Sequence, residues 1–166
     1  MKQIYAAALA CLALAAAAPA EAGETRFTCP DLTKGVKLGD CPSEQEMKDS
    51  YNASCPEALQ KSGACPEFGS YMVLKSKALW SVFSSGQEFL PYISCLISEE
   101  KIRASKPIGV RVKCDTATER CKALCEYDND VYVELRFAGM CHTDTGEAID
   151  CKTDPAACAV TCETGE

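Results

Sequence analysis

The cysteines constrain this chain more than any other feature. The sequence of 166 residues has thirteen, and one of them, Cys11, lies inside an apolar run near the N-terminus. The remaining twelve are an even number, and in an oxidising compartment such thiols pair. We therefore predict a disulfide framework that supplements a modest apolar core. Its members are Cys29, Cys41, Cys55, Cys65, Cys95, Cys114, Cys121, Cys125, Cys141, Cys151, Cys158 and Cys162.

The N-terminal segment has the pattern of a signal peptide. Lys2 precedes an apolar run from Ile4 to Ala18, which is shorter than the roughly 20 residues that a membrane-spanning helix needs. Small residues at Ala20 and Ala22 then supply cleavage sites. We predict that residues 1–22 are removed on export and that the mature protein is secreted and extracellular. No later run is apolar for long enough to be a transmembrane segment.

The expected fold class is α+β, with a helical N-terminal region (23–106) followed by a region rich in short strands and turns (107–166). In the first region four cysteines are each followed by proline, at residues 29, 41, 55 and 65. A residue before proline is held extended, and proline suits the first turn of a helix. Each Cys-Pro pair therefore predicts a helix start. The four helices expected cover residues 44–51, 56–61, 71–83 and 91–104, with Trp80 outside the apolar stripe and partly exposed.

Beyond Pro107 the apolar residues alternate, which predicts strands near residues 108–112 and 131–135. The turn-forming Asp144-Thr145-Gly146 suggests a hairpin between residues 132–142 and 147–151. The spacing C-x6-C-x3-C also occurs twice, at Cys114, Cys121 and Cys125 and again at Cys151, Cys158 and Cys162. We interpret it as an internal repeat in which each C-x3-C pair shares one face of a short helix. Chance similarity of two cysteine-rich segments is the alternative.

Cysteine parity links the two regions. Five of the twelve precede Pro107 and seven follow it. If all pair within one chain, at least one bridge must join the regions, and Cys95 with Cys114 is the nearest pair across the boundary. A covalent dimer through odd cysteines is the alternative.

No set of residues in the sequence forms a complete catalytic or metal site. His142 is the single histidine, which excludes an acid–base pair of two imidazoles and leaves it structural or solvent-exposed. A zinc site with Cys141 is disfavoured because secretion favours disulfides over thiolate ligands. The alternating Glu126, Asp128 and Asp130 resemble the opening of a calcium loop but lack its later glycine and glutamate, so a polar turn is the better interpretation. No cofactor or metal is predicted.

The net charge of −7 disfavours nucleic acid as a partner, because an acidic surface repels polyphosphate. A basic stretch from Lys101 to Lys113 opposes this balance, and we interpret it as a solvated face, with contact to an anionic surface as the alternative. Asn52, in Asn52-Ala53-Ser54, is a candidate N-glycosylation site.

These observations favour a secreted binding or effector protein that presents loops on a disulfide frame to an extracellular protein or surface partner. An inhibitor or toxin-like ligand, with Lys34 as an exposed basic residue, is the narrower form of this hypothesis. Two alternatives stay open: a small secreted hydrolase that uses a carboxylate pair, and a carrier of a small apolar ligand between the helices.

The cysteine count makes a direct prediction. All twelve cysteines of the mature chain should resist alkylation until a reductant is added, and should then all react, because each is half of one of six intramolecular bridges. Intact mass before and after reduction measures this. Two or more thiols that react in the native protein would contradict it.

Overall fold

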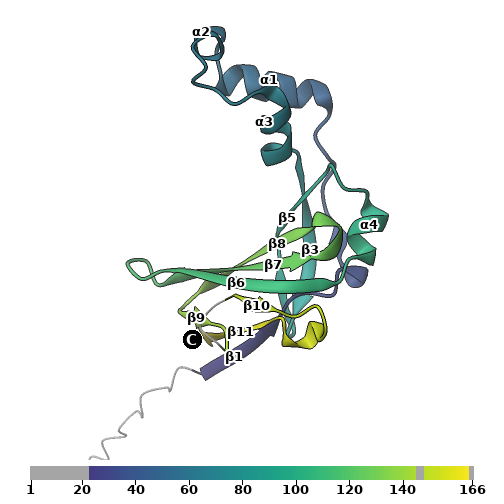
Figure 1. The fold of residues 1–166 in the computed structure, drawn as a ribbon, viewed down its shortest axis with the longest axis vertical. Coiled ribbons are helices and arrows are strands. Elements are labelled where there is room, and N and C mark those ends of the chain that lie inside the picture. The colour runs from purple at the N-terminus through teal and green to yellow at the C-terminus, as the bar shows by residue number, and fades with distance from the viewer. Residues whose placement is uncertain (1–22, 145–147, 165–166) are drawn as a thin grey trace, which may run out of the picture.

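The computed structural model describes residues 23–144 and 148–164, which form a mixed fold of helices and antiparallel strands with more residues in strands. Figure 1 shows three groups of elements: a helical arm at the top, a layer of long strands below it, and a second layer beneath. The elements are β1 (Gly23–Thr28), η1 (Leu32–Lys34), β2 (Val36–Lys37), α1 (Glu44–Ser54), α2 (Glu57–Lys61), α3 (Phe68–Lys75), β3 (Lys77–Ser84), β4 (Gln87–Phe89), β5 (Tyr92–Ser94), α4 (Glu99–Ala104), β6 (Pro107–Asp115), β7 (Arg120–Tyr127), η2 (Asp128–Asp130), β8 (Tyr132–Ala138), β9 (Cys141–His142), β10 (Ile149–Asp150), η3 (Pro155–Ala157) and β11 (Ala159–Thr164).

The strands make three small sheets. The main sheet has the order β10-β6-β7-β8, a second has the order β1-β11-β9, and β3 pairs with β2, β4 and β5 in the third. Three phenylalanines, one from each sheet, meet in the shared core. The ring of Phe27 lies 5.8 Å from that of Phe89 and 4.9 Å from that of Phe137, and the last two are 5.3 Å apart. These buried rings fasten the three sheets to one another.

The central strand of the main sheet is β7, where a short helix carrying Cys121 and Cys125 was expected; that prediction is wrong. Residues four apart share one face of a strand as well as of a helix, because side chains alternate with period two. Cys121, Ala123, Cys125 and Tyr127 all face the core of the protein. Of the second C-x3-C pair, Cys162 lies on strand β11 and Cys158 directly precedes that strand.

The disulfide framework is confirmed, with all twelve cysteines in bridges. The bridge between Cys29 and Cys125 joins the two regions of the chain, as parity required, but Cys95 and Cys114 do not pair with each other. The six pairs are Cys29–Cys125, Cys41–Cys95, Cys55–Cys65, Cys114–Cys121, Cys141–Cys162 and Cys151–Cys158.

The C-x6-C-x3-C repeat is reproduced in the pairing. In both copies the first two cysteines, seven residues apart, bond to each other, and the third bonds to a distant cysteine. Only the first copy is a β-hairpin, in which Cys114 lies directly opposite Cys121.

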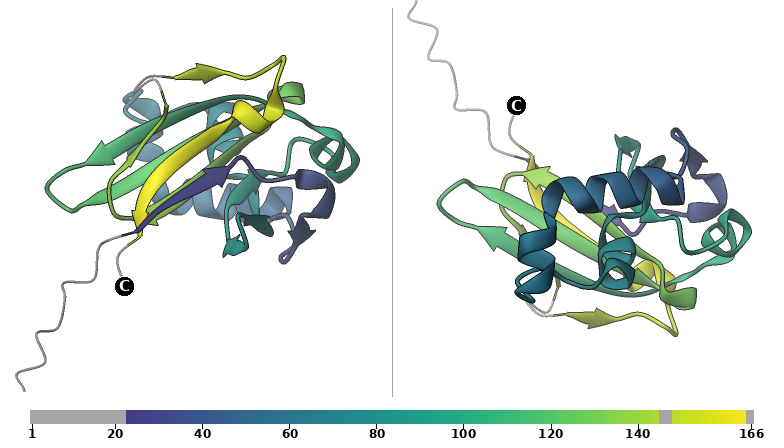
Figure 2. Two further views of the ribbon diagram at one scale, coloured as in Figure 1. Left: turned by 90° about the horizontal axis from the view of Figure 1, so that it is seen from below. Right: turned by 90° about the horizontal axis from the view of Figure 1, so that it is seen from above.

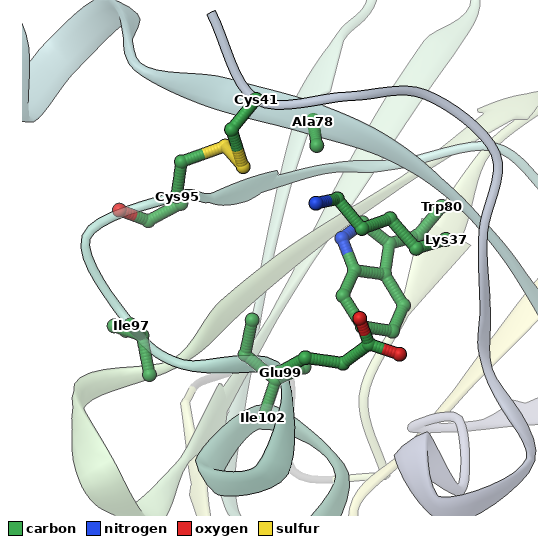
Figure 3. A pocket seen from close by; sticks show the side chains of 9 residues that line it. Lys37, Cys41, Ala78, Trp80, Cys95, Ile97, Glu99 and Ile102 are labelled. Atoms are coloured by element: carbon green, nitrogen blue, oxygen red, sulfur yellow. A yellow bond between two sulfur atoms is a disulfide. The ribbon is translucent and has the colours of Figure 1, made fainter. Parts of the chain in front are cut away.

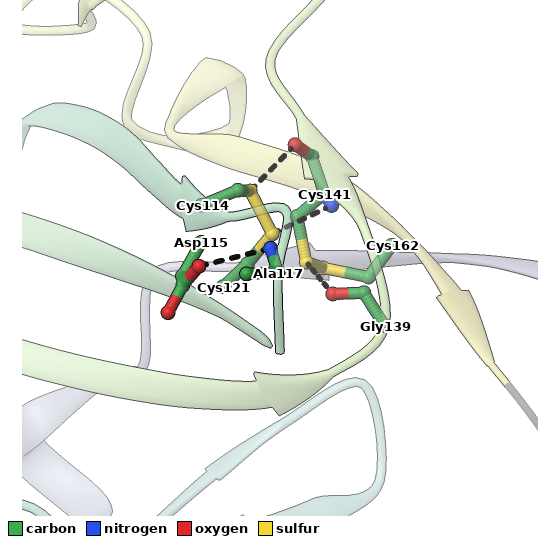
Figure 4. The surroundings of a disulfide bond; sticks show 7 residues. All are labelled: Cys114, Asp115, Ala117, Cys121, Gly139, Cys141 and Cys162. Atoms are coloured by element: carbon green, nitrogen blue, oxygen red, sulfur yellow. Dashed lines mark hydrogen bonds between the residues drawn. A yellow bond between two sulfur atoms is a disulfide. The ribbon is translucent and has the colours of Figure 1, made fainter. Parts of the chain in front are cut away.

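Figure 4 shows the bridge Cys114–Cys121 beside Cys141–Cys162, with the Cys141 N–H donating to Cys121 Sγ at 3.0 Å. The chain reaches that point through Gly139, where a Cβ would collide with the Glu163 carbonyl oxygen.

The Cys-Pro predictions of helix starts are supported, because a helical turn begins within three residues of each cysteine. The capping box is present as well: the Glu46 N–H donates to Ser43 Oγ at 3.2 Å, and the Ser43 N–H donates to the Glu46 carboxylate at 2.7 Å. The α1 helix runs on to Ser54, beyond the expected end near Tyr51, and stops at Cys55, the residue before Pro56.

The helix expected over residues 71–83 is wrong. The α3 helix ends at Lys75, and β3 begins at Lys77, so only the first third of the apolar stripe is helical. Trp80 is buried rather than partly exposed, under the guanidinium of Arg103, which lies 5.4 Å from its ring centre. The fourth expected helix is also shorter, since β5 occupies residues 92–94 and α4 starts at Glu99. Helices and strands thus share the N-terminal region.

In the C-terminal region the two predicted strands are present as β6 and β8, but the expected hairpin is wrong. The β8 strand pairs with β7, and β10 pairs with β6, because β7 fills the place that was assigned to a helix. Residues Thr145–Glu147 of the expected turn lie outside the described residues.

The helical arm, residues 42–75, stands away from the sheets. Figure 1 shows it joined to the rest of the protein by the segment before α1 and by β3. Its helices pack mainly on each other, α1 against α3, and the bridge Cys41–Cys95 closes its base. The arm is therefore a small unit with a core and a disulfide of its own.

Two variants, each lacking one disulfide, should distinguish the stability of the arm from that of the rest of the protein. The bridge Cys29–Cys125 spans 96 residues and Cys55–Cys65 spans ten. The chain-entropy contribution is about 4.7 kcal/mol for a loop near 100 residues and about 3 kcal/mol for one near 15. Replacing both Cys29 and Cys125 by serine should lower the stability of the whole protein. Replacing Cys55 and Cys65 should remove hydrogen-exchange protection from α1 and α3 alone, and loss of protection in β7 with that variant would contradict the two-unit description.

Candidate functional site

A groove of about 810 Å³ lies between the arm and the main sheet. Seen from above in Figure 2 (right), α1 and α3 lie over the strands of that sheet, and Figure 1 shows the arm above the sheet. The end of α3 forms one wall, the segment from β4 to β5 forms another, and β8 contributes the floor. The lining residues are Leu74, Lys75, Lys77, Gln87, Glu88, Phe89, Leu90, Pro91, Tyr92, Glu134 and Arg136.

Three apolar side chains in this groove are unusually exposed. Leu74 is 61% exposed, Leu90 54% and Tyr92 63%, although Phe89 and Ile93, the sequence neighbours of the last two, are buried. Leu74 comes from α3, whereas Leu90 and Tyr92 come from the segment that joins β4 to β5 and from the start of β5; they converge on one groove, although exposed apolar residues on a monomer are normally scattered. Convergence of this kind is typical of a binding surface.

The arm holds Leu74 in place through a small aromatic cluster. The ring of Tyr51 in α1 lies 5.4 Å from Phe68 and 5.2 Å from Tyr71, both in α3. The Tyr51 hydroxyl donates to the Pro66 carbonyl oxygen at 2.8 Å, and the hydroxyls of Ser50 and Tyr71 are 2.8 Å apart. These contacts use the inner face of α3, so Val73 and Leu74 point away from the arm's own core.

The floor of the groove continues into a row of cations across the main sheet. Lys113 on β6 lies directly opposite Lys122 on β7, and Lys122 lies directly opposite Arg136 on β8. All three are exposed. Neighbouring strands are about 4.8 Å apart, and like charges placed opposite one another destabilise a sheet. This cation row, Lys113–Lys122–Arg136, is therefore a local cost to the fold in a protein whose net charge is negative.

Two carboxylates share the groove, and both are already engaged. The Glu88 carboxylate accepts a hydrogen bond from Ser81 Oγ at 2.5 Å. Glu134 accepts from Arg136 Nε at 2.8 Å and lies 3.4 Å from Lys122 Nζ. Partial burial acts to raise the pKa of the Glu134 carboxyl, but these hydrogen bonds and the charges of Lys122 and Arg136 together hold the pKa below its ordinary value.

This electrostatic setting does not suit Glu134 to act as the general acid of a glycosidase. The general acid of such an enzyme needs a raised pKa so that it carries a proton near neutral pH. Glu134 has the opposite shift and stays ionised between two cations. It neutralises part of the cation row instead.

The pocket beside Trp80 does not provide the cavity that an apolar carrier needs. Figure 3 shows it between the bridge Cys41–Cys95, the indole of Trp80 and the start of α4 near Glu99. Its volume is about 20 Å³, room for about one water molecule. It also lies under α4 rather than between the helices of the arm.

The residues that sequence reasoning singled out are spread over the molecule, outside the groove. His142 is exposed on β9, and Asp144 forms an ion pair with Arg26 at 3.0 Å. Glu126 pairs with Arg111, and Asp128 accepts the Lys106 N–H at 2.8 Å in the turn η2. Among the described residues no group of three or more histidine, cysteine, aspartate or glutamate side chains is arranged to hold a metal ion.

The basic stretch is divided between two places. Lys101 and Arg103 lie on α4, where Arg103 pairs with Glu99 and donates to the Gly35 carbonyl oxygen at 2.5 Å. Lys113 belongs to the cation row on the sheet. Asn52, the glycosylation candidate, is exposed in the last turns of α1, and its modification stays a prediction. In the described part of the chain no helix is long and apolar enough to cross a membrane.

No family model matches this chain, and no curated protein or solved structure matches it either.

Sequence reasoning missed the groove because its residues are brought together only by strand pairing. Leu74 and Arg136 are 62 positions apart in the sequence (136 minus 74). One signal was present: Lys122 and Glu126 alternate with apolar residues in Cys121–Tyr127, although Leu124 interrupts the pattern, and this indicates a strand with one solvated face. Recognising that strand would have placed Lys122 between the two others.

Replacing Glu134 by glutamine should leave the cation row without its nearest counter-charge. We expect the free energy of unfolding to fall by about 0.2–1 kcal/mol at neutral pH and low salt, the range of exposed ion pairs. Because the folded pKa of Glu134 is lowered, its contribution is complete above the ordinary glutamate pKa and is lost as the pH falls through the folded value. In denaturant titrations the difference in the free energy of unfolding between wild type and variant should become smaller at acid pH. Glu24→Gln, an exposed change on β1, is the control, and an equal effect there would contradict the assignment.

Proposed function

We propose that this chain is a secreted binding protein that holds an extracellular polypeptide partner in the groove between the arm and the main sheet. The observation that carries the proposal is the convergence of Leu74, Leu90 and Tyr92, all more than half exposed, on one groove. Burial of such side chains against a partner removes apolar surface from water, which is the usual driving force for association.

The disulfides support a binding role because they fix both walls of the groove before a partner arrives. Cys55–Cys65 holds the arm together, and Cys41–Cys95 ties its base to the chain just after β5, the strand that follows Leu90. A surface held in its bound geometry loses less conformational entropy on association. Secretion is consistent with the number of bridges, since disulfides persist in oxidising compartments.

The hydrolase alternative has less support than binding. The groove's two carboxylates are engaged by Ser81, Lys122 and Arg136, and the one with a shifted pKa is shifted in the wrong direction for a general acid.

Selection of short peptides from a random displayed library on the immobilised, oxidised protein tests the proposal. Enriched peptides should bind wild type, and Tyr92→Ala and Leu74→Ser should weaken that binding by about tenfold or more, as expected for anchor residues. Because both side chains are exposed, neither change should lower thermal stability much.

Leu59→Ser is the matched control, because Leu59 is another exposed leucine of the arm but lies outside the groove. Peptides that bind all three variants as tightly as wild type would contradict the groove as the binding site. Turnover of a polysaccharide panel that is lost in Glu134→Gln or Glu88→Gln would instead establish the hydrolase.

A further inference from the structure

The groove runs along a free strand edge. In the main sheet β8 is the last strand, paired with β7 on one side and with no strand on the other within the described residues. The short β5 strand lies near β8 but pairs with β3. The residues of β8 that line the groove are Glu134 and Arg136, which face the segment from Gln87 to Tyr92.

The backbone groups of these two residues point toward the groove. The Tyr127 N–H donates to the Val131 carbonyl oxygen at 2.9 Å, which makes that pair the first hydrogen-bonded pair of the β7–β8 hairpin. Hydrogen-bonded pairs alternate along an antiparallel ladder. Val133, Leu135 and Phe137 therefore bond to β7. The N–H and C=O groups of Glu134, Arg136 and Ala138 point outward, at the spacing that an added strand requires.

The charges beside this edge are mostly positive. Lys75, Lys77 and Arg136 line the groove, and Lys122 and Lys113 extend the cation row from it across the sheet. The two acidic residues present are already bonded to other side chains of the protein. A partner that supplies carboxylates opposite these cations would relieve the repulsion within the row.

We propose that the partner is an extended acidic polypeptide segment that adds as a strand to the open edge of β8, with its carboxylates beside Arg136, at the β8 end of the cation row, and its apolar side chains against Leu74, Leu90 and Tyr92. The inference rests on the proposed function and names the chemistry of its ligand. In this mode main-chain hydrogen bonds supply affinity, and pockets for alternate side chains supply specificity.

A peptide fits better than an anionic polysaccharide, because two leucines and a strand's free amide groups complement a peptide rather than a chain of hydroxyls. A second copy of this chain fits poorly, since pairing two β8 edges would bring two cation rows together.

The experiment uses the intact oxidised protein and two synthetic peptides, one alternating leucine with glutamate and the other alternating leucine with lysine. The acidic peptide should bind at least about tenfold more tightly at low salt. Lys122→Glu and Arg136→Glu should abolish or reverse that preference. Lys34→Glu, an equal charge change on η1 outside the groove, should leave it intact.

A second measurement tests strand addition separately from charge. Two versions of the acidic peptide are methylated at alternate backbone nitrogens, so that each lacks the hydrogen-bond donors along one of its two edges. The version that lacks the donors facing β8 should bind about tenfold or more weakly. Bound peptide should also slow hydrogen exchange of the Glu134 and Arg136 amides.

The possible failures can be distinguished from one another. If groove-dependent peptides are selected but show no charge preference, the proposed function stands and this inference is wrong. If heparin binds the cation row and both methylated peptides bind equally well, the partner is a polyanion rather than a strand. If neither peptide binds and the library gives no groove-dependent peptide, both proposals are wrong.

Discussion

The bridge between Cys29 and Cys125 is the constraint on which the rest of the structure depends. It ties the end of β1 to the central strand β7, across 96 residues, and the chain beside it is held by two further contacts. The Tyr127 hydroxyl donates to the Pro30 carbonyl oxygen at 2.7 Å, and the Cys29 N–H donates to the Cys158 carbonyl oxygen at 2.7 Å. One short segment thus joins the main sheet to the sheet of β1 and β11. Burial and the nearby charge of Asp31 raise the pKa of Tyr127, so this hydroxyl keeps its proton for the hydrogen bond at any physiological pH.

The arm is stabilised differently, because it has little core to rely on. Met47, Cys55 and Tyr71 are the buried apolar residues of its helices and their connections, and a unit of that size is marginal without covalent support. Cys55–Cys65 supplies that support within the arm, and Cys41–Cys95 supplies it at the base. Because the arm is so small, no further layer of it covers Val73 and Leu74, and both stay exposed.

The sequence was a good guide to local chemistry and a poor guide to strand pairing. The capping box at Ser43 and the Cys-Pro helix starts depend on neighbouring residues, and the structure contains them. Parity required a bridge between the two regions but could not identify Cys125 as the partner of Cys29. The helix expected over residues 71–83 failed because Ser76 ends α3, and the residues after it join a sheet through distant strands, which helical spacing cannot reveal. The groove was missed for the same reason, since the row of Lys113, Lys122 and Arg136 exists only once β6, β7 and β8 are in register.

That register also explains how a small acidic protein can keep three cations side by side. The opposite face of the same strands is packed with Cys121, Ala123, Val133 and Leu135, and a shift of one residue would turn these apolar side chains to solvent. The hairpin bridge Cys114–Cys121 at the start of β7 holds the register of β6 and β7 covalently, and the bridge Cys29–Cys125 further along β7 ties that strand to the end of β1. Repulsion within the cation row is small beside the burial of these apolar side chains, and Glu134 offsets part of it by pairing with Lys122 and Arg136. The three cations therefore stay side by side on the surface.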